Sequence, residues 1–326
     1  MREHAGRAAL GPHRWVPTLA VAFLALVAAA GLVRAAQPDA GDAEIHVLPV
    51  QGNVYMLVSA GANVTVQIGD DGVVLVDTQV GPLVPKILAA VRTLSDKPIH
   101  TIINTHLHAD HTGGNMALQK LGAGGGQARI IAHENVLRRM MSAPDHVPNS
   151  QAGLPLSGYF TPTRDIHVNG EAIVLHHVPD AHTDGDSLVF FRGSDVVSAG
   201  DVFTPETYPI VDLDNGGSVQ GVVNALNRIL DLTVPARFQE GGTYVIPGHG
   251  RLCDEADVVE YRDMVVIVRD RVQDLIDRGM TLEQVQDARP SRDYDTEYGG
   301  EPDRFVEAVY WSLSQGDRAG GGAPAP

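Results

Sequence analysis

Hydrophobic and polar positions divide the chain into a strand-rich first part and a helical last part. Four short apolar, β-branched runs lie at 45–50, 54–59, 64–68 and 73–77, and turn residues such as glycine and asparagine separate them. This pattern predicts an antiparallel meander of four strands. An amphipathic repeat then predicts a helix over 82–94 with proline at its entry.

Strands and helices alternate along the rest of the chain. Further strands are predicted at 99–104, 129–132, 172–178, 187–192, 195–198 and 244–246, and further helices at 133–141, 218–230, 254–278 and 302–313. A capping box formed by Thr281 and Gln284 predicts one more helix. The proline- and glycine-rich segment 142–163 indicates a long loop. The order predicts an α/β (α+β) fold with two sheets and helices outside them.

The first 35 residues differ from the rest of the chain. Three arginines precede an apolar run at 18–33, and Val33-Arg34-Ala35 forms a small-residue cleavage pattern. This order predicts a signal peptide, so we expect an exported protein, periplasmic or extracellular, with no stable membrane partner after cleavage. The alternative is an uncleaved N-terminal membrane anchor, although the run is short for a span of about 20 residues.

Composition and charge exclude several classes of protein. A hydrophobic fraction of 44% in 326 residues excludes wholesale disorder. The net charge is −16, and without the four arginines and one glutamate of residues 1–35 it is −19. Nucleic acid is therefore not the expected partner, because phosphate binding needs clustered lysine and arginine.

The single cysteine, Cys253, excludes a disulfide framework and is expected to be buried and inert. Oligomeric state stays open.

Metal-ligating side chains gather directly after the predicted strand at 99–104. His106, His108, Asp110 and His111 fall within six residues. Residues i and i+2 of an extended segment point to the same side, so His106 and His108 can bind one ion. Asp110 and His111 follow where the chain turns into a helix, and they can face a second ion.

Three more candidate ligands follow other predicted strands, namely His182, Asp201 and His249. Ligands at successive strand ends converge on one edge of a sheet. Imidazole and carboxylate donors without a usable thiolate suit zinc or another first-row metal. Nearby, we expect Asp184 and Asp186 to set the turn around His182 rather than to bind metal.

The order HxHxDH, a lone His before Thr, Gly-Asp and Gly-His-Gly resembles the metallo-β-lactamase superfamily over about residues 45–250. The resemblance implies a four-layer αββα sandwich with a C-terminal helical extension and two Zn²⁺ ions. It also implies the ligands: His106, His108 and His182 for the first ion, Asp110, His111 and His249 for the second, and Asp201 as the bridge, as in glyoxalase-II-like members. The C-terminal helices resemble those of an exported bacterial subgroup of metallo-hydrolases.

The chain is expected to divide into four segments. These are a signal peptide over 1–35, a metallo-β-lactamase-like catalytic domain over 36–252, a C-terminal helical extension packed on it over 253–315, and a disordered tail over 316–326.

The implied reaction is hydrolysis of an ester, thioester, lactone or amide bond in a small-molecule substrate by a metal-bridging hydroxide. Asp110 would accept the proton from the bridging water while remaining a ligand. Tyr159, Tyr208 and Asp212 are candidate substrate-pocket residues, whereas His133 is expected to cap or pack a helix.

Two other reactions remain open. Hydrolysis of β-lactams fits both export and the metal site. An iron-dependent oxidoreductase of the persulfide dioxygenase type would use the same fold with iron in place of zinc, and metal analysis distinguishes it. A non-catalytic scaffold is disfavoured by the complete ligand set.

Overall fold

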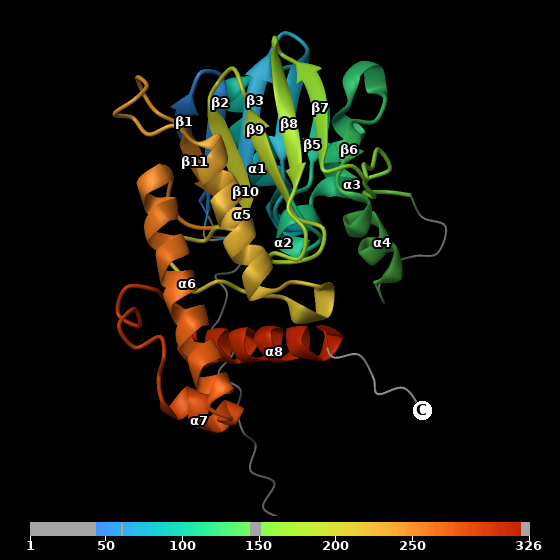
Figure 1. Cartoon of the computed structure of the whole chain (residues 1–326). Helices are drawn as coiled ribbons and strands as arrows, with labels where there is room; N and C mark the ends of the chain where they lie inside the picture. Colours follow the sequence, from blue (N-terminus) through green and yellow to red (C-terminus); the bar gives the residue numbers. More distant parts are fainter. Residues whose placement is uncertain (1–43, 60, 144–150, 321–326) are drawn as a thin grey trace, which may run out of the picture. The chain divides into compact units, whose positions relative to one another are not determined.

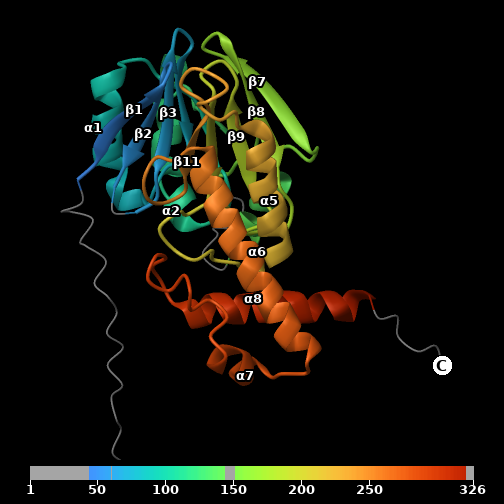
Figure 2. The same ribbon diagram turned by 60° about the vertical axis from the view of Figure 1, so that its left-hand side comes forward.

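Two mixed β-sheets pack face to face, and helices cover the outer side of each sheet (Figures 1 and 2). The computed structural model describes residues 44–59, 61–143 and 151–320, so the predicted signal peptide lies outside the described residues. The strand order is β1-β2-β3-β4-β5-β6 in the first sheet and β11-β10-β9-β8-β7 in the second. This is the αββα sandwich expected from the sequence.

The first sheet starts with the predicted antiparallel meander and continues with two parallel strands. Its strands are β1 (His46–Gln51), β2 (Val54–Val58), β3 (Val64–Gly69), β4 (Gly72–Val76), β5 (Ile99–Ile103) and β6 (Arg129–Ile131). The turn η1 (Gly81–Leu83) and helix α1 (Val84–Leu94) connect β4 to β5. Parallel strands need such a crossover, and it brings the ends of β4 and β5 to the same edge.

The segment between β5 and β6 contains short helical turns, and helix α4 follows β6. These elements are α2 (Ala109–Thr112), α3 (Asn115–Leu118), η2 (Gln119–Leu121), η3 (Ala123–Gly125) and α4 (Glu134–Ser142). The ring of His133 accepts a hydrogen bond from the backbone N–H of Asn135 at the start of α4 (3.4 Å). The expected capping role of His133 is therefore confirmed.

The second sheet is antiparallel except for its last pair of strands. Its strands are β7 (Thr163–Val168), β8 (Glu171–His177), β9 (Ser187–Phe191), β10 (Val196–Gly200) and β11 (Tyr244–Pro247). The turn η4 (Leu213–Asn215) and helix α5 (Val219–Leu232) lie between the parallel strands β10 and β11. Strand β7 was not predicted, because it is an edge strand with only Ile166 and Val168 buried.

Three apolar layers hold the sandwich together. Ile103 and Val189 meet between the two sheets, Ile87 of α1 packs under the first sheet, and Leu226 of α5 packs on the second. Each of these side chains is fully buried, and burying one such side chain contributes about 1.5–3 kcal/mol. The edge that carries the loops after β5 and β10 is thereby fixed.

The last third of the chain is helical and shares the core of the second sheet. It contains α6 (Glu255–Asp277), α7 (Leu282–Asp287) and α8 (Pro302–Gly320), and α8 crosses α6 (Figure 1). Both α6 and α7 begin with a capping box, at Asp254 and Thr281. The disordered tail expected over 316–326 stays a prediction: α8 as described runs to Gly320, and 321–326 lie outside the described residues. Among the described helices, none has the length and apolarity to cross a membrane.

Candidate metal centre

Seven side chains that the sequence singled out meet at one edge of the sandwich. They follow β5 of the first sheet and β8, β10 and β11 of the second, and the last three strands end at one edge because they run in the same direction. The structure brings all seven together in two groups: His106, His108, His182 and Asp201 in the first, and Asp110, His111 and His249 in the second.

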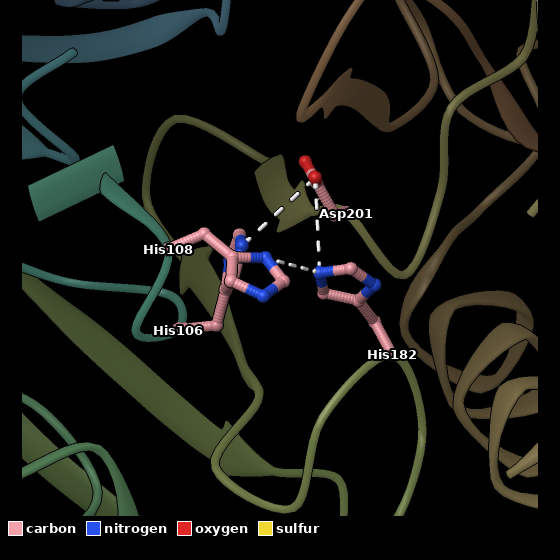
Figure 3. Close-up of side chains that lie close together, drawn as sticks. All are labelled: His106, His108, His182 and Asp201. Carbon is pink, nitrogen blue, oxygen red and sulfur yellow. Dashed lines mark hydrogen bonds and ion pairs between the residues drawn. The ribbon is translucent and has the colours of Figure 1, made fainter. Parts of the chain in front are cut away.

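The first group surrounds one small space with its nitrogen and oxygen atoms (Figure 3). Nε2 of His182 lies 2.9 Å from Nδ1 of His108. Nε2 of His106 and Nε2 of His182 lie 3.9 and 3.8 Å from Oδ2 of Asp201. All four ligand atoms are within 4.8 Å of one another, so a single ion can contact all of them.

The second group lies on the other side of Asp201. Oδ1 of Asp201 is 3.1 Å from Nε2 of His111 and 3.5 Å from Nε2 of His249. Oδ2 of Asp110 is 3.3 Å from Nε2 of His249. Position 248 must be glycine, because a Cβ on Gly248 would collide with Oδ1 of Asp201. Asp201 thus presents one oxygen to each group.

Hydrogen bonds on the outer side of the imidazole rings set which nitrogen faces the centre. Nδ1 of His182 donates to the carbonyl of Ile210 (2.6 Å), and Nε2 of His108 donates to Oδ2 of Asp212 (2.8 Å). Nδ1 of His111 donates to Oδ2 of Asp77 (2.8 Å). The inner nitrogens of neutral rings therefore direct lone pairs at one another, which requires a proton or a cation between them.

Three buried polar atoms of the centre have no hydrogen-bond partner among the described residues: Nε2 of His106, Nε2 of His111 and Oδ1 of Asp201. Nε2 of His111 is 3.1 Å from Oδ1 of Asp201, but the geometry is not that of a hydrogen bond. Leaving a buried polar group unpaired costs about 1–3 kcal/mol. Because all three atoms are metal-ligating types at one place, the donor set fits two first-row divalent ions.

The electrostatics of the centre also favour a bound cation. Although burial acts in the opposite direction, the charge of His111 holds the pKa of the Asp201 carboxyl well below its usual range. Burial also opposes the shift at His111, but Asp201 and Asp77 raise its pKa well above the ordinary value. At His249, Asp110 and Asp201 outweigh burial and raise the pKa to about 9. The carboxylates therefore stabilise positive charge at this place.

Asp77 is a functional residue that the sequence analysis missed. Its carboxylate is buried and accepts hydrogen bonds from the backbone N–H and the hydroxyl of Thr105 (2.8 and 2.7 Å) as well as from His111. It follows β4, directly beside the histidine-rich loop after β5. The signal was available, because Asp77 is one more carboxylate at the end of a buried strand.

Asp212 was predicted to line the substrate pocket, and in the structure its side chain is hydrogen-bonded to His108. It lines a cleft next to the centre, and its carboxylate accepts hydrogen bonds from His108 and from Nδ2 of Asn215 (2.7 Å). Burial would raise its pKa, but the hydrogen bond from His108 holds the pKa of Asp212 below its usual range. The 208–215 loop thus contacts both His108, through Asp212, and His182, through Ile210.

The two predicted tyrosines have different surroundings. Tyr208 lines the same cleft, but its hydroxyl donates to Oδ1 of Asp295 (2.9 Å). Tyr159 does not line this cleft: it is buried between the sheets and its hydroxyl bonds to Oγ of Ser187 (2.7 Å). A substrate contact for Tyr159 has no support in this geometry.

The remaining sequence-based expectations concern residues around the centre. The carboxylate of Asp186 accepts hydrogen bonds from the backbone N–H and the hydroxyl of Thr183 (2.7 and 2.8 Å), so it sets the turn that carries His182. Asp184 pairs with Arg139 (2.8 Å). Cys253 is buried, and burial raises the pKa of its thiol to about 12, as expected for an inert cysteine.

Residues 49–249 match the family model described as the metallo-beta-lactamase superfamily. The chain is 29% identical over 198 residues to the alpha subunit of 2,4-dinitroanisole O-demethylase from Nocardioides sp., covering 58% of this chain and 56% of that protein. It is 24% identical over 257 residues to a linear primary-alkylsulfatase from Pseudomonas sp., covering 66% of this chain and 47% of that protein. The chain therefore spans about half the length of the curated relatives it matches.

Solved structures share the fold at low sequence identity. A double mutant of a sec-alkylsulfatase matches with a TM-score of 0.62 and 17% identity, over 86% of this chain and 52% of that one. A metallo-beta-lactamase from Pontibacter korlensis matches with a TM-score of 0.54 and 15% identity, over 68% of this chain and 99% of that one.

Proposed function

This chain belongs to the metallo-beta-lactamase superfamily, and from that premise we propose that it is an exported hydrolase with two zinc ions that cleaves an ester, thioester, lactone or amide bond in a small-molecule substrate. The observation that carries the proposal is the pair of ligand groups around Asp201, with three buried atoms that lack a hydrogen-bond partner in the described part of the chain. Relatives and structural neighbours include alkylsulfatases and metallo-beta-lactamases, which are hydrolases.

The residues divide the work between the two groups. His106, His108 and His182 would hold one ion, Asp110, His111 and His249 the other, and Asp201 would contact both. When bound, the two ions would polarise the scissile group and lower the pKa of an attacking water toward about 7. The hydrogen bonds to Asp77, Asp212 and the carbonyl of Ile210 keep the imidazoles oriented.

Asp110 would accept the proton of the attacking water. Its Oδ2 lies 3.3 Å from Nε2 of His249 and 3.7 Å from Nε2 of His111, and the side chain is 38% exposed. Although burial acts in the opposite direction, these two histidines lower the pKa of the Asp110 carboxyl. The group is therefore a carboxylate at neutral pH, and it borders both the centre and the solvent.

A sulfate monoester is a second candidate substrate. The fold similarity to the sec-alkylsulfatase covers 86% of this chain, against 68% for the metallo-beta-lactamase. It therefore extends beyond the sandwich into the C-terminal helices. An alkylsulfatase is also among the sequence relatives.

Metal content and a substrate panel test the proposal. We expect two zinc ions per purified chain and hydrolysis of at least one ester, thioester, lactone, amide or alkyl sulfate. Chelation and His106→Ala should abolish that activity. His167→Ala, on the exposed side of edge strand β7, should leave both metal and activity unchanged. Full activity in His106→Ala would overturn the proposal.

Two results would replace the assignment. Turnover of a cephalosporin comparable to that of the best ester would make β-lactam hydrolysis the main reaction. Stoichiometric iron with oxygen uptake would instead establish an oxidoreductase of the persulfide dioxygenase type.

Export is tested separately by sequencing the N-terminus of the protein purified from cells. We expect it to begin at Ala36 and the protein to fractionate with the soluble exported fraction. An intact N-terminus in the membrane fraction would favour the anchored alternative.

A further inference from the structure

A cleft of about 760 Å³ borders the metal centre at His108. Its walls are the 207–214 segment and one face of helix α8, which crosses beneath the end of the sandwich in Figure 1. Cavities of this volume are typical of small-molecule sites. The cleft is therefore large enough to take the part of a substrate that extends away from the reacting bond.

The cleft contains apolar side chains that have not been covered by the fold. Ile210 from the loop is 52% exposed and Trp311 from α8 is 38% exposed, whereas Phe305, which also lines the cleft, is buried. Nε1 of Trp311 donates to Oε1 of Glu307 (3.4 Å). Apolar surface that stays exposed beside a candidate active site favours contact with an apolar ligand.

The charged side chains of the cleft are mostly acidic. Asp214, Glu301 and Glu307 are exposed and face a single cation, Arg304. None of these four forms an ion pair within the part of the chain that the structure describes. The carboxylate of Asp212 is already engaged by His108 and Asn215. The cleft therefore carries an excess of unpaired negative charge.

We infer that this cleft binds the non-reacting arm of the substrate, and that the arm is apolar and ends in a cationic rather than an anionic group. The inference rests on the proposed function, because it describes another part of the same substrate. Ile210 and Trp311 contact the apolar portion. An ammonium end gains from the carboxylates and from the indole face, whereas a carboxylate end is repelled.

The inference is tested with matched esters. Three 4-nitrophenyl alkanoates of equal chain length would end in methyl, trimethylammonium or carboxylate. We expect kcat/KM to be about tenfold higher for the ammonium end than for the carboxylate end, with the difference shrinking at high salt. Within the methyl series, kcat/KM should rise about threefold per added methylene until the cleft is full. Equal rates for all three ends would overturn the inference.

Variants show whether the discrimination arises in this cleft. Glu301→Lys should reverse the preference between the charged esters, and Trp311→Ala should remove most of the gain from chain length. Trp311→Phe should retain that gain. Glu240→Lys makes the same charge change on an exposed residue outside the cleft, and it should leave the preference unchanged. A preference unaffected by Glu301→Lys contradicts the assignment.

Binding gives a readout that does not depend on hydrolysis. Hexyltrimethylammonium would be titrated into the purified protein, in which Trp311 is the only tryptophan once residues 1–35 are removed; Trp15→Phe achieves the same in a protein that keeps them. We expect saturable quenching of its fluorescence, with a Kd about tenfold higher in Glu301→Lys and unchanged in Glu240→Lys. No saturable binding would overturn the inference. Binding without hydrolysis of any ester, thioester, lactone, amide or alkyl sulfate would leave the cleft assigned and reject the proposed reaction.

Discussion

The two halves of the metal centre are supported in different ways. His111, in the second group, is held by Asp77, a buried carboxylate that also accepts two hydrogen bonds from Thr105. His108, in the first group, is held by Asp212, whose side chain is 18% exposed on a loop that lines the cleft. One half is therefore supported by a buried carboxylate of the core, and the other by a loop that lines the cleft.

The loop has its own support from helix α4. Arg139 donates to both carboxylate oxygens of Asp184 (2.8 Å each), to Oδ1 of Asn215 (3.0 Å) and to the carbonyl of Asp214. The first group, the loop-held half, thus has its supporting carboxylate Asp212 near the surface. The second group, the core-held half, has its supporting carboxylate Asp77 buried in the core. Support built from surface contacts is less costly to disturb.

Removing the group shared by both halves should have the largest effect. Asp201→Asn should lower the hydrolytic activity at least about a thousandfold and reduce the bound metal, because one oxygen of Asp201 faces each ligand group. Metal analysis and initial rates check this. Asp231→Asn, which removes a carboxylate that is 70% exposed, is the control. Retention of two ions and full activity in Asp201→Asn would contradict the bridging position.

Asp77→Asn should damage both folding and the second metal site. The amide of asparagine keeps the size but places a donor near the buried donors of Thr105 and His111. We expect the free energy of unfolding of the metal-free protein to fall by about 3 kcal/mol and the Kd of the second ion to rise about 10- to 100-fold. Urea unfolding in chelator and calorimetric zinc titration measure the two effects. A change in Kd alone would argue against the core-held description.

Asp212→Asn should weaken the first metal site with little effect on folding. Its carboxylate is partly exposed, so we expect the free energy of unfolding of the metal-free protein to change by less than about 1 kcal/mol. The Kd of the first ion should rise about 10- to 100-fold, because His108 loses its carboxylate partner. The same calorimetric titration resolves the two ions. Equal weakening of both sites would erase the distinction between the halves.

Adjacent arginines on α4 give a matched test of the loop support. Arg139→Gln removes the contacts to Asp184 and Asn215, and we expect the Kd of the first ion to rise roughly threefold. Arg138→Gln, one residue earlier, removes only contacts to Glu134 and Asn135 at the surface, and should leave both Kd values unchanged. Similar effects from the two variants would mean that the loop does not depend on Arg139.

The ligand residues could be predicted from the sequence because each follows a buried strand. His106, His108 and their neighbours form a compact motif, and the strands around them have clear apolar patterns. Strand β7 was missed because its exposed residues are polar and charged, so only two buried side chains mark it. Packing at the sheet edge, rather than local pattern, makes that segment a strand.

The supporting residues could not be assigned in the same way. The role of Asp212 depends on which nitrogen of His108 faces it, and the role of Asp77 depends on the parallel pairing of β4 with β5. Both are properties of the folded chain. Tyr159 shows the converse case: its sequence neighbourhood suggests a loop residue, but the segment folds over the sheets and buries the ring.

The smallest expected effect concerns Cys253, on the core-held side. Backbone hydrogen bonds between Cys253 and Val245 close the loop that carries His249. Burial raises the pKa of the thiol to about 12, from 9.0 in an unfolded chain. Its contribution to stability is therefore complete below pH 9 and is lost as the pH rises from 9 to 12. At pH 9.5 the loss is at most about 1 kcal/mol.

Urea unfolding of the wild type and Cys253→Ala from pH 7 to 9.5 should show the steeper decline in the wild type. If the unfolding free energies of the two proteins fell in parallel with pH, the thiol would ionise as freely in the folded protein as in the unfolded chain. The packing around β11 would then be more accessible to solvent than its burial implies.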